Sequence, residues 1–338
     1  MAKKETVLIT GAAGEVAHAL IPVLAENFNC RIIALDIKSP EKSLKPFISK
    51  SIRGSVTNES LLVSAVKNEK VTSIFHLAAV LSTSAEKDPE GAHKVNVGGT
   101  FNLLNIANKY AQKLERPLKF IFPSTIAVYG LPDVKTKGRV GKVEEGEFNN
   151  PITIYGVNKL YCENLGIYYF KHYSLLNPKR NPSIDFRCVR FPGLISALTL
   201  PSGGTSDYAP EMIHAAAKGK NYSCFVRKDT TIPFMAMADA AEVLLEIYKV
   251  KGSMLKRRVY NVSGFSASAK DIENKVKEAF PKTVVNYETD LARQKIVDSW
   301  PEEVDDSNAI KDWGWKPKFD FDKTFSDYLI PSISERYT

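Results

Sequence analysis

The sequence predicts an α/β protein with a doubly wound, Rossmann-type parallel sheet and a small C-terminal α/β lobe. Three observations support this fold class. Short apolar segments of strand length alternate with helical patterns as far as residue 190, which requires parallel strands joined by right-handed crossovers. A glycine-rich turn, Gly11-x-x-Gly14, joins the first apolar segment to the first helical pattern. The regular alternation stops after Pro192.

Six segments have the pattern of strands in a parallel sheet, because most are short, apolar and rich in β-branched or aromatic residues. They are Thr6–Thr10, Cys30–Asp36, Ile52–Ser55, Thr72–Leu77, Leu118–Phe122 and Ile184–Arg190. Three segments between them place apolar residues at helical spacing: Glu15–Glu26, Pro89–Gln112 and Tyr155–Tyr173. We therefore assign residues 1–190 to one Rossmann domain.

Residues 191–338 read as a smaller lobe that covers the open edge of the sheet. Its predicted elements are short helices at Asp239–Lys249 and Ala269–Ala279 and isolated strands at Arg258–Val262 and Val284–Tyr287. The segment Ser174–Ser183, rich in Pro, Lys and Arg, reads as a surface insertion.

Composition excludes several classes of protein. With 338 residues, 44% hydrophobic and 25% charged, the chain is typical of soluble globular proteins. The net charge is +8, but basic and acidic residues are interleaved, so we expect no nucleic-acid partner. No long apolar span or leader precedes the first strand, which indicates no membrane segment and a cytoplasmic location, with a mitochondrial one open for a eukaryotic source. The four cysteines form no C-x-x-C pair, so we predict reduced thiols and no metal site.

The turn after the first strand has the features of a dinucleotide site. In Gly11-x-x-Gly14-x-x-Ala17, the first glycine forms the turn, the second lets the backbone approach a pyrophosphate, and Ala17 is small enough for helix packing. Asp36 ends the second strand, where a carboxylate accepts from ribose hydroxyls and repels a 2′-phosphate. This favours NAD over NADP, although the nearby Lys38 leaves NADP as the alternative.

Further cofactor contacts are expected from the same turn and from the carboxyl ends of neighbouring strands, where such folds bind ligands. These residues are Ala13, Glu15, Val16, Ile37, Gly54, Ser55, Leu77, Ala78, Ala79 and Leu194.

Tyr155 and Lys159 are four positions apart in a predicted helix, so their side chains share one face. A phenol titrates near ~10, and an adjacent ammonium favours the phenolate. The pair is suited to a general base that takes a proton from an alcohol while hydride leaves its carbon.

Together these residues resemble the extended short-chain dehydrogenase/reductase family. The matching motifs are Gly11-x-x-Gly14, Asp36, His76-Leu-Ala-Ala79, Lys94-Val-Asn-Val-Gly-Gly-Thr100, Phe122-Pro-Ser-Thr-Ile-Ala-Val-Tyr-Gly130 and Tyr155-x-x-x-Lys159. The resemblance implies that Tyr155 is the catalytic base, and that Lys159 lowers its pKa and binds the nicotinamide ribose. It further implies that Thr125, with Ser124 beside it, contacts the substrate oxygen. Asn96 is implied to hold the adjacent helix and a water near the cofactor, or to serve only in helix packing.

The C-terminal half favours one branch of that family. Nucleotide-sugar enzymes of the family carry an Arg where this chain has Ile232, and an apolar side chain cannot compensate two phosphate charges. Gly203-Gly-Thr-Ser-Asp-Tyr208 and Asp298-Ser-Trp-Pro301 instead look like the short-chain L-threonine 3-dehydrogenases. That resemblance implies oxidation of the C3 hydroxyl of threonine to 2-amino-3-oxobutanoate. It also implies a homodimer formed through a four-helix bundle of the helices near 89–112 and after 155.

A zwitterionic amino acid needs donors for its carboxylate and an acceptor for its ammonium. We expect substrate contacts from Ser82, Thr125, Tyr155, Gly193, Thr205, Ser206, Asp207 and Trp300. The alternative roles are that Thr205 stabilises a turn and that Asp207 caps a helix, since both residue types favour these positions. Gly203-Gly204 would give a closing loop its freedom.

Three alternatives remain open from the sequence. The first is a dehydrogenase of another small hydroxy compound, such as a sugar acid. The second is a nucleotide-sugar epimerase, which Ile232 and Arg190-Phe-Pro-Gly193 disfavour. The third is a non-catalytic NAD-sensing protein, which the joint presence of Thr125, Tyr155 and Lys159 disfavours.

Overall fold

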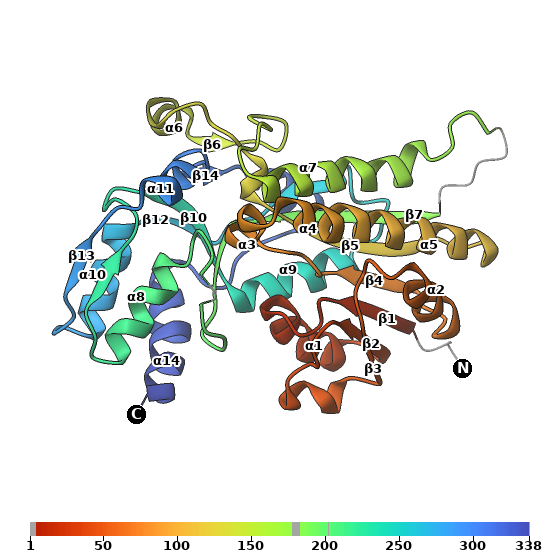
Figure 1. The fold of residues 1–338 in the computed structure, drawn as a ribbon, viewed down its shortest axis with the longest axis horizontal. Helices are drawn as coiled ribbons and strands as arrows, with labels where there is room; N and C mark the ends of the chain where they lie inside the picture. The colour runs from red at the N-terminus through yellow and green to blue at the C-terminus, as the bar shows by residue number, and fades with distance from the viewer. Residues whose placement is uncertain (1–4, 178–182, 202, 338) are drawn as a thin grey trace.

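The computed structural model describes residues 5–177, 183–201 and 203–337, and its centre is a seven-stranded parallel sheet (Figure 1). The strand order is β11-β7-β5-β4-β1-β2-β3. The strands are β1 (Glu5–Thr10), β2 (Cys30–Asp36), β3 (Lys50–Arg53), β4 (Ser73–His76), β5 (Leu118–Thr125), β7 (Ile184–Phe191) and β11 (Val259–Asn261). The predicted parallel α/β sheet is thus confirmed.

Strand β1 lies where the direction of winding reverses. Val7 is opposite Ile32 of β2 on one side and Ser73 of β4 on the other. The chain therefore proceeds from β1 to β2 and β3 in one direction, and through β4, β5 and β7 in the other. In open α/β sheets this reversal leaves a crevice at the carboxyl ends of the strands, which is the usual ligand site.

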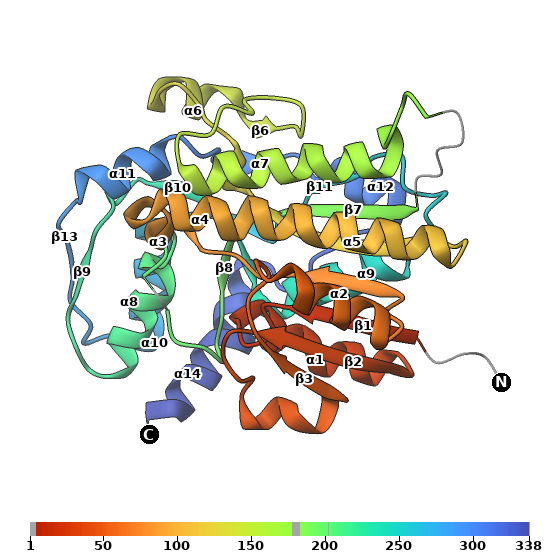
Figure 2. The same cartoon turned by 45° about the vertical axis from the view of Figure 1, so that its right-hand side comes forward.

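Helices cover both faces of the sheet because successive side chains of each strand point to opposite faces (Figure 2). On β1, Val7 and Ile9 pack in the core beneath α1 (Glu15–Asn27) and α9 (Met237–Lys249). Leu8 packs in the opposite core. That second face is covered by α2 (Glu59–Asn68), α5 (Gly99–Lys113) and α7 (Ile154–Ile167).

The long helix expected at Pro89–Gln112 contains a change of geometry. It consists of α4 (Pro89–His93), a π-helical segment η2 (Lys94–Gly98) and α5. Helix α7 likewise continues into a π-helical segment, η4 (Tyr168–His172). π-helical turns are rare overall, but those that occur are often found at functional sites. Segment η2 carries Asn96.

The expectation of an isolated strand at 258–262 is wrong. Strand β11 is the edge strand of the main sheet, with Val259 opposite Cys188 of β7. Helix α9 also belongs to this layer, since it packs on α1. A three-residue strand has too little apolar pattern to show which sheet it joins, and its partner lies about seventy residues earlier. The last strand of the Rossmann sheet therefore follows the boundary that we predicted at residue 190.

The lobe has its own core and small sheets, seen at the C-terminal side of Figure 1. Its strands are β8 (Gly193–Ile195) and β10 (Thr231–Ala236) with β12 (Phe265–Ser268), β9 (Tyr222–Cys224) with β13 (Val285–Tyr287), and β6 (Lys142–Val143) with β14 (Glu303–Val304). The predicted strand near 284–287 is thus paired rather than isolated. Its helices are α8 (Tyr208–Ala217), α10 (Ala269–Ala279), α11 (Leu291–Asp298), α13 (Phe321–Lys323), the π-helical η5 (Thr324–Leu329) and α14 (Ile330–Tyr337).

The remaining elements are short connections. They are η1 (Lys42–Phe47), α3 (Ser82–Lys87), η3 (Ile126–Val128), α6 (Val134–Val140) and α12 (Ser307–Trp313). The predicted insertion at 174–183 is described only in part, because residues 178–182 lie outside the described ranges. In the part of the chain that the structure describes, no helix is both long and apolar enough to cross a bilayer.

Helix α7 approaches η3, the turn that follows β5, closely at Gly156. A Cβ built on Gly156 would lie 2.0 Å from the Ala127 carbonyl oxygen and 2.8 Å from Cβ of Pro151. Any larger residue would push the first turn of α7, which carries Tyr155, away from the sheet.

We therefore expect Gly156→Ala to lower the free energy of unfolding by about 1–3 kcal/mol through overpacking. The measurement is denaturant unfolding followed by circular dichroism. Gly138→Ala is the matched control, because a Cβ on Gly138 of α6 meets no atom within 4 Å. Equal stability of the two variants would contradict the close approach.

Candidate active site

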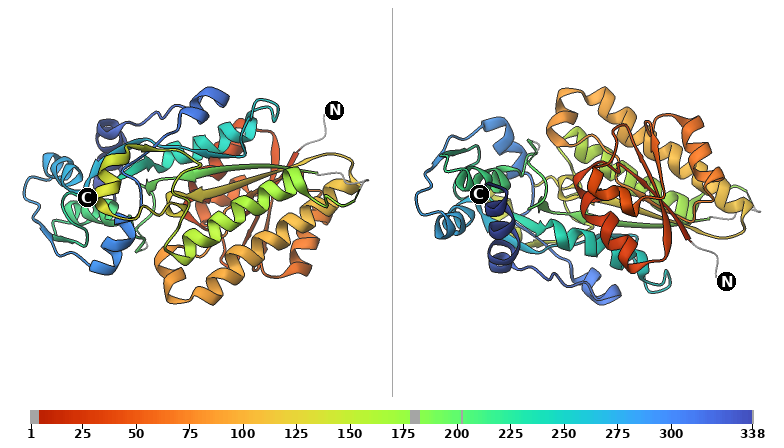
Figure 3. Two further views of the ribbon diagram at one scale, coloured as in Figure 1. Left: turned by 90° about the horizontal axis from the view of Figure 1, so that it is seen from above. Right: turned by 90° about the horizontal axis from the view of Figure 1, so that it is seen from below.

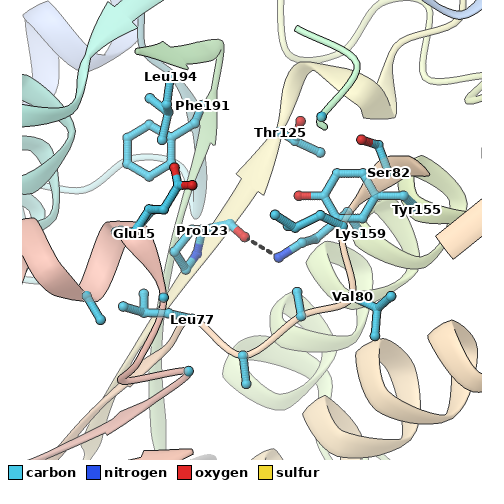
Figure 4. Close-up of a pocket in the computed structure, with 18 of the residues that line it drawn as sticks. Glu15, Leu77, Val80, Ser82, Pro123, Thr125, Tyr155, Lys159, Phe191 and Leu194 are labelled. Atoms are coloured by element: carbon cyan, nitrogen blue, oxygen red, sulfur yellow. Dashed lines mark hydrogen bonds between the residues drawn. The ribbon is translucent and has the colours of Figure 1, made fainter. Parts of the chain in front are cut away.

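A cavity of about 590 Å³ opens at the carboxyl ends of β1, β4 and β5, between the sheet and the lobe. Most of the predicted site residues line it. These are Gly11, Ala13, Gly14, Glu15, Val16, Asp36, Ile37, Gly54, Ser55, Leu77, Ala78, Ala79, Ser82, Ser124, Thr125, Tyr155, Lys159, Leu194, Thr205, Ser206, Asp207 and Trp300. In Figure 4, Glu15 and Leu194 lie on one side of the cavity and Tyr155, Thr125 and Ser82 on the other.

The glycine-rich turn fits a dinucleotide. Gly11 has φ +69°, and a Cβ there would lie 2.6 Å from the Ala78 backbone nitrogen. Only glycine therefore allows the turns after β1 and β4 to lie this close at the crevice. Asp36 accepts hydrogen bonds from the Ala13 and Lys38 backbone N–H groups, at 3.0 and 2.9 Å, which orient its carboxylate at the end of β2.

Tyr155 and Lys159 reach the cavity from the first turns of α7. The Thr153 hydroxyl caps this helix by accepting from the Gly156 N–H at 3.1 Å. The Lys159 ammonium donates to the Pro123 carbonyl oxygen at 2.6 Å, the dashed line in Figure 4. The same Nζ lies 5.9 Å from the centre of the Tyr155 ring. The pair predicted from the four-residue spacing is therefore brought together at the crevice.

Burial controls the ionisation of this pair in the protein alone. It raises the pKa of the Tyr155 phenol, against the opposing effect of the nearby Thr125 side chain. Burial also lowers the pKa of Lys159 to about 8. The expectation that Lys159 lowers the pKa of the phenol stays a prediction, and withdrawal from water is the largest influence on the Tyr155 pKa in the protein alone.

Two hydroxyl groups on the cavity wall lack partners. The Ser124 and Thr205 hydroxyl oxygens are buried, and neither has a hydrogen-bond partner among the residues that the structure describes. A buried hydroxyl without a partner costs free energy, so these groups indicate where a polar ligand belongs. The Thr125 hydroxyl, in contrast, accepts from the Ala127 N–H at 3.2 Å.

Asn96 supports the cavity from outside. Its side-chain amide donates to the Val80 carbonyl oxygen at 3.0 Å, and its side-chain oxygen accepts from the Val80 N–H at 2.7 Å. This pair of bonds fixes the 77–82 segment, which lines the cavity. Asn96, Lys38 and Gly193 are the predicted site residues that do not line it.

Asp207 organises the loop before α8. One of its carboxylate oxygens accepts from the Gly203 and Gly204 backbone N–H groups, at 2.9 and 2.7 Å. The alternative role that we considered, a side-chain cap of α8, is not observed: Asp207 occupies the cap position without that bond. Trp300 lines the cavity and also packs in the lobe core.

Several lining residues were not predicted. They are Val80, Leu81, Val95, Pro123, Phe191, Pro192, Gly204 and Met237, among others. A signal existed for Pro123, Phe191 and Pro192, because they stand at the carboxyl ends of predicted strands. None existed for Met237, which follows β10 of the separate lobe sheet.

Glu15, on one side of the cavity, interacts electrostatically with Asp207 of the 203–207 loop. Burial, followed by the charge of Asp207, raises its pKa to about 7, while the nearby Thr199 side chain acts in the opposite direction. A carboxyl group at the first turn of α1 thus binds its proton more tightly than a solvent-exposed glutamate does.

Fold and cavity together define an enzyme that binds a nicotinamide cofactor at the crevice of a Rossmann sheet and acts on a small molecule. The chain belongs to the NAD dependent epimerase/dehydratase family, whose model matches residues 7–263.

Individual relatives are more specific. The chain is 34% identical to the mitochondrial L-threonine 3-dehydrogenase of Bos taurus over 97% of this chain and 83% of that protein. A monomeric L-threonine 3-dehydrogenase from a metagenome, in its apo form, superposes with a TM-score of 0.86 at 35% identity, covering 98% of this chain and 100% of that one. The L-threonine 3-dehydrogenase of Trypanosoma brucei gives a TM-score of 0.84 at 33% identity, covering 97% and 98%.

The raised pKa of Glu15 predicts a pH-dependent effect on stability. Between pH 4.5 and about 7 the folded protein keeps a proton that the unfolded chain loses, so the stability contributed by Glu15 falls as pH rises through this window. Glu15→Gln removes the titration. We expect the melting temperature of the variant, relative to the unsubstituted protein, to be higher at pH 8 than at pH 5, by on the order of 1–2 °C.

Differential scanning calorimetry at the two pH values measures this difference. Glu26→Gln, an exposed position on the same helix, is the control. A Glu15→Gln difference that is the same at both pH values would show that Glu15 titrates normally.

Proposed function

We propose that the protein oxidises L-threonine at C3 to 2-amino-3-oxobutanoate with NAD. The observation that carries this proposal is the cavity in which Tyr155, Lys159 and Thr125 face a dinucleotide crevice beside the unpartnered Thr205 hydroxyl. The threonine dehydrogenases among its relatives support the choice of substrate.

Tyr155 accepts the proton of the C3 hydroxyl, and its position at the cavity end of α7 suits this role. NAD, when bound, supplies the hydride acceptor and a positive charge that favours the phenolate. Lys159 holds its ammonium at this end of the cavity through the Pro123 carbonyl. The Thr125 hydroxyl contacts the reacting oxygen as it becomes a carbonyl, a contact that is most useful in the transition state.

Hydroxyl donors bind the substrate carboxylate in this proposal. Thr205 and Ser206 approach from the lobe and Ser82 from α3, so the donors lie on two sides of the cavity. Because Asp207 already binds two backbone N–H groups, we assign it to the loop rather than to the substrate ammonium.

A nucleotide sugar fits this site poorly. Ile232, at the position of the pyrophosphate-binding Arg of the nucleotide-sugar enzymes, is fully buried in the lobe core. It presents no charge to the cavity, so two phosphate charges would stay uncompensated there.

For the nucleotide cofactor, the fixed Asp36 carboxylate favours NAD. It stands at the end of β2, where the ribose hydroxyls of a dinucleotide lie in this fold class, and it would repel a 2′-phosphate.

We also propose a homodimer through α5 and α7, which lie side by side on one face of the molecule (Figure 3). Large apolar side chains are exposed along these helices. They are Phe101, Val157, Tyr161 and Tyr168, each 42–51% exposed. Such a row favours a partner helix pair over water.

The activity is tested by following NADH absorbance with L-threonine, a sugar acid and a nucleotide sugar. We expect NADH formation with L-threonine and NAD, and a much lower rate with NADP. Tyr155→Phe should lower kcat by about 10²–10⁴-fold, because it removes the proton acceptor but keeps the ring.

Tyr161→Phe, an exposed tyrosine on the same helix, is the control and should keep the rate. Activity with the sugar acid but not with L-threonine would overturn the proposed substrate. Full activity of Tyr155→Phe would overturn the proposed base.

Tyr161→Glu should convert the dimer to a monomer, because it places a charge in the apolar row on α7. Size-exclusion chromatography with light scattering measures the mass. Leu291→Glu, at an 81% exposed position on α11, should leave the mass unchanged. A monomeric unsubstituted protein would refute the dimer.

A further inference from the structure

We propose that Thr83 and Arg293 are positioning residues for the small-molecule substrate, which they serve by holding the 203–207 loop from two sides. This inference rests on the proposed function for the identity of the substrate. Neither side chain lines the cavity, so each acts through the loop that carries Thr205.

Thr83 holds the loop from the sheet side of the cavity. Its hydroxyl, on α3, donates to the Gly203 carbonyl oxygen at 2.9 Å, across 120 residues of sequence. The preceding residue, Ser82, lines the cavity. The bond therefore links the two segments that provide hydroxyl donors, α3 and the 203–207 loop.

Arg293 holds the next carbonyl from the lobe side. Its guanidinium donates to the Gly204 oxygen at 2.6 Å and lies 3.2 Å from the centre of the Phe225 ring. Asp290 caps α11 by accepting from the Ala292 and Arg293 N–H groups. A planar group held by stacking and by a capped helix has little freedom, so it defines the direction of the Gly204 carbonyl.

Asp207 completes the arrangement from within the loop. Its carboxylate binds the N–H groups of Gly203 and Gly204, while Thr83 and Arg293 bind their carbonyls. Both glycines are therefore held at both of their backbone polar groups.

Two adjacent glycines would otherwise have the largest conformational freedom in the chain, and Gly203 has φ +88°. Holding them directs Thr205, the next residue, whose buried hydroxyl has no hydrogen-bond partner among the described residues. Loss of either contact should let the loop sample other conformations, so that substrate binding must reorder it. We expect the loss of a contact to lower substrate affinity rather than to slow the chemical step, because the hydride and proton acceptors lie elsewhere.

Steady-state kinetics on the full-length protein tests this role. We expect Thr83→Val and Arg293→Lys each to raise KM for L-threonine about five- to tenfold, the loss expected for one hydrogen bond. The value of kcat should change less than about threefold, and the dissociation constant of NAD should be unchanged. Thr83→Ser should restore the KM, since it keeps the hydroxyl.

The matched controls lie beside the two residues. Ser84→Ala on α3 and Lys295→Gln on α11 are exposed positions and should keep the KM. Equal losses of kcat and NAD binding in Thr83→Val and Arg293→Lys would indicate general damage and would overturn the positioning role.

Amide hydrogen exchange of the 203–207 segment supplies a readout that does not depend on the substrate. We expect faster exchange there in Thr83→Val and Arg293→Lys, and no change in the sheet. If the unsubstituted protein fails to oxidise L-threonine but the variants exchange faster, the substrate is wrong and the loop contacts stand. Unchanged exchange in both variants would overturn the proposal.

Discussion

The position of α7 against the end of β5 is the constraint on which the site depends. Lys159 carries a buried ammonium, and burying an unpaired charge is costly. Its bond to the Pro123 carbonyl and its place 4.4 Å from the centre of the Phe122 ring offset part of that cost. Because Pro123 and Phe122 belong to β5, the ammonium ties the helix to the strand. Gly156 permits this close approach, and the approach places Tyr155 at the cavity.

A second buried pair supports α7 one turn further along. Arg190 at the end of β7 binds Glu163 through two parallel hydrogen bonds, at 2.9 and 2.6 Å, with both side chains 3% exposed. Arg190 also donates to the Glu145 carbonyl oxygen, two residues after β6. The helix is thus connected to two neighbouring strands, β5 and β7, and to the segment after β6. Such a fully bonded pair favours one register of α7 over sliding along the sheet.

One side of the cavity is rigid, because backbone pairing holds it, and the other side is held by individual side chains. The turns after β1 and β4 are placed by strand pairing and by the Gly11 contact, and Asn96 adds two bonds to the Val80 backbone. The 203–207 loop instead depends on individual side chains from α3, from α11 and from the loop itself. Glu15, in the first turn of α1 on the rigid side, responds to the charge of Asp207 on the loop. Binding of a cofactor and of a small substrate therefore places different demands on the same cavity.

The sequence alone determined the parallel sheet, the nucleotide turn and the Tyr155–Lys159 pair, because each depends on spacing within one or two neighbouring elements. Tertiary structure decided the membership of β11 in the main sheet, whose strand is too short to show its partner. It also decided the contacts of Thr83 and Arg293 with the glycine loop, which join segments 120 and 89 residues apart. Local pattern fixes which face a residue occupies, but contacts of this kind arise only when distant elements pack together. Tertiary structure also decided the direction of the Tyr155 pKa shift, since burial is a property of the folded chain.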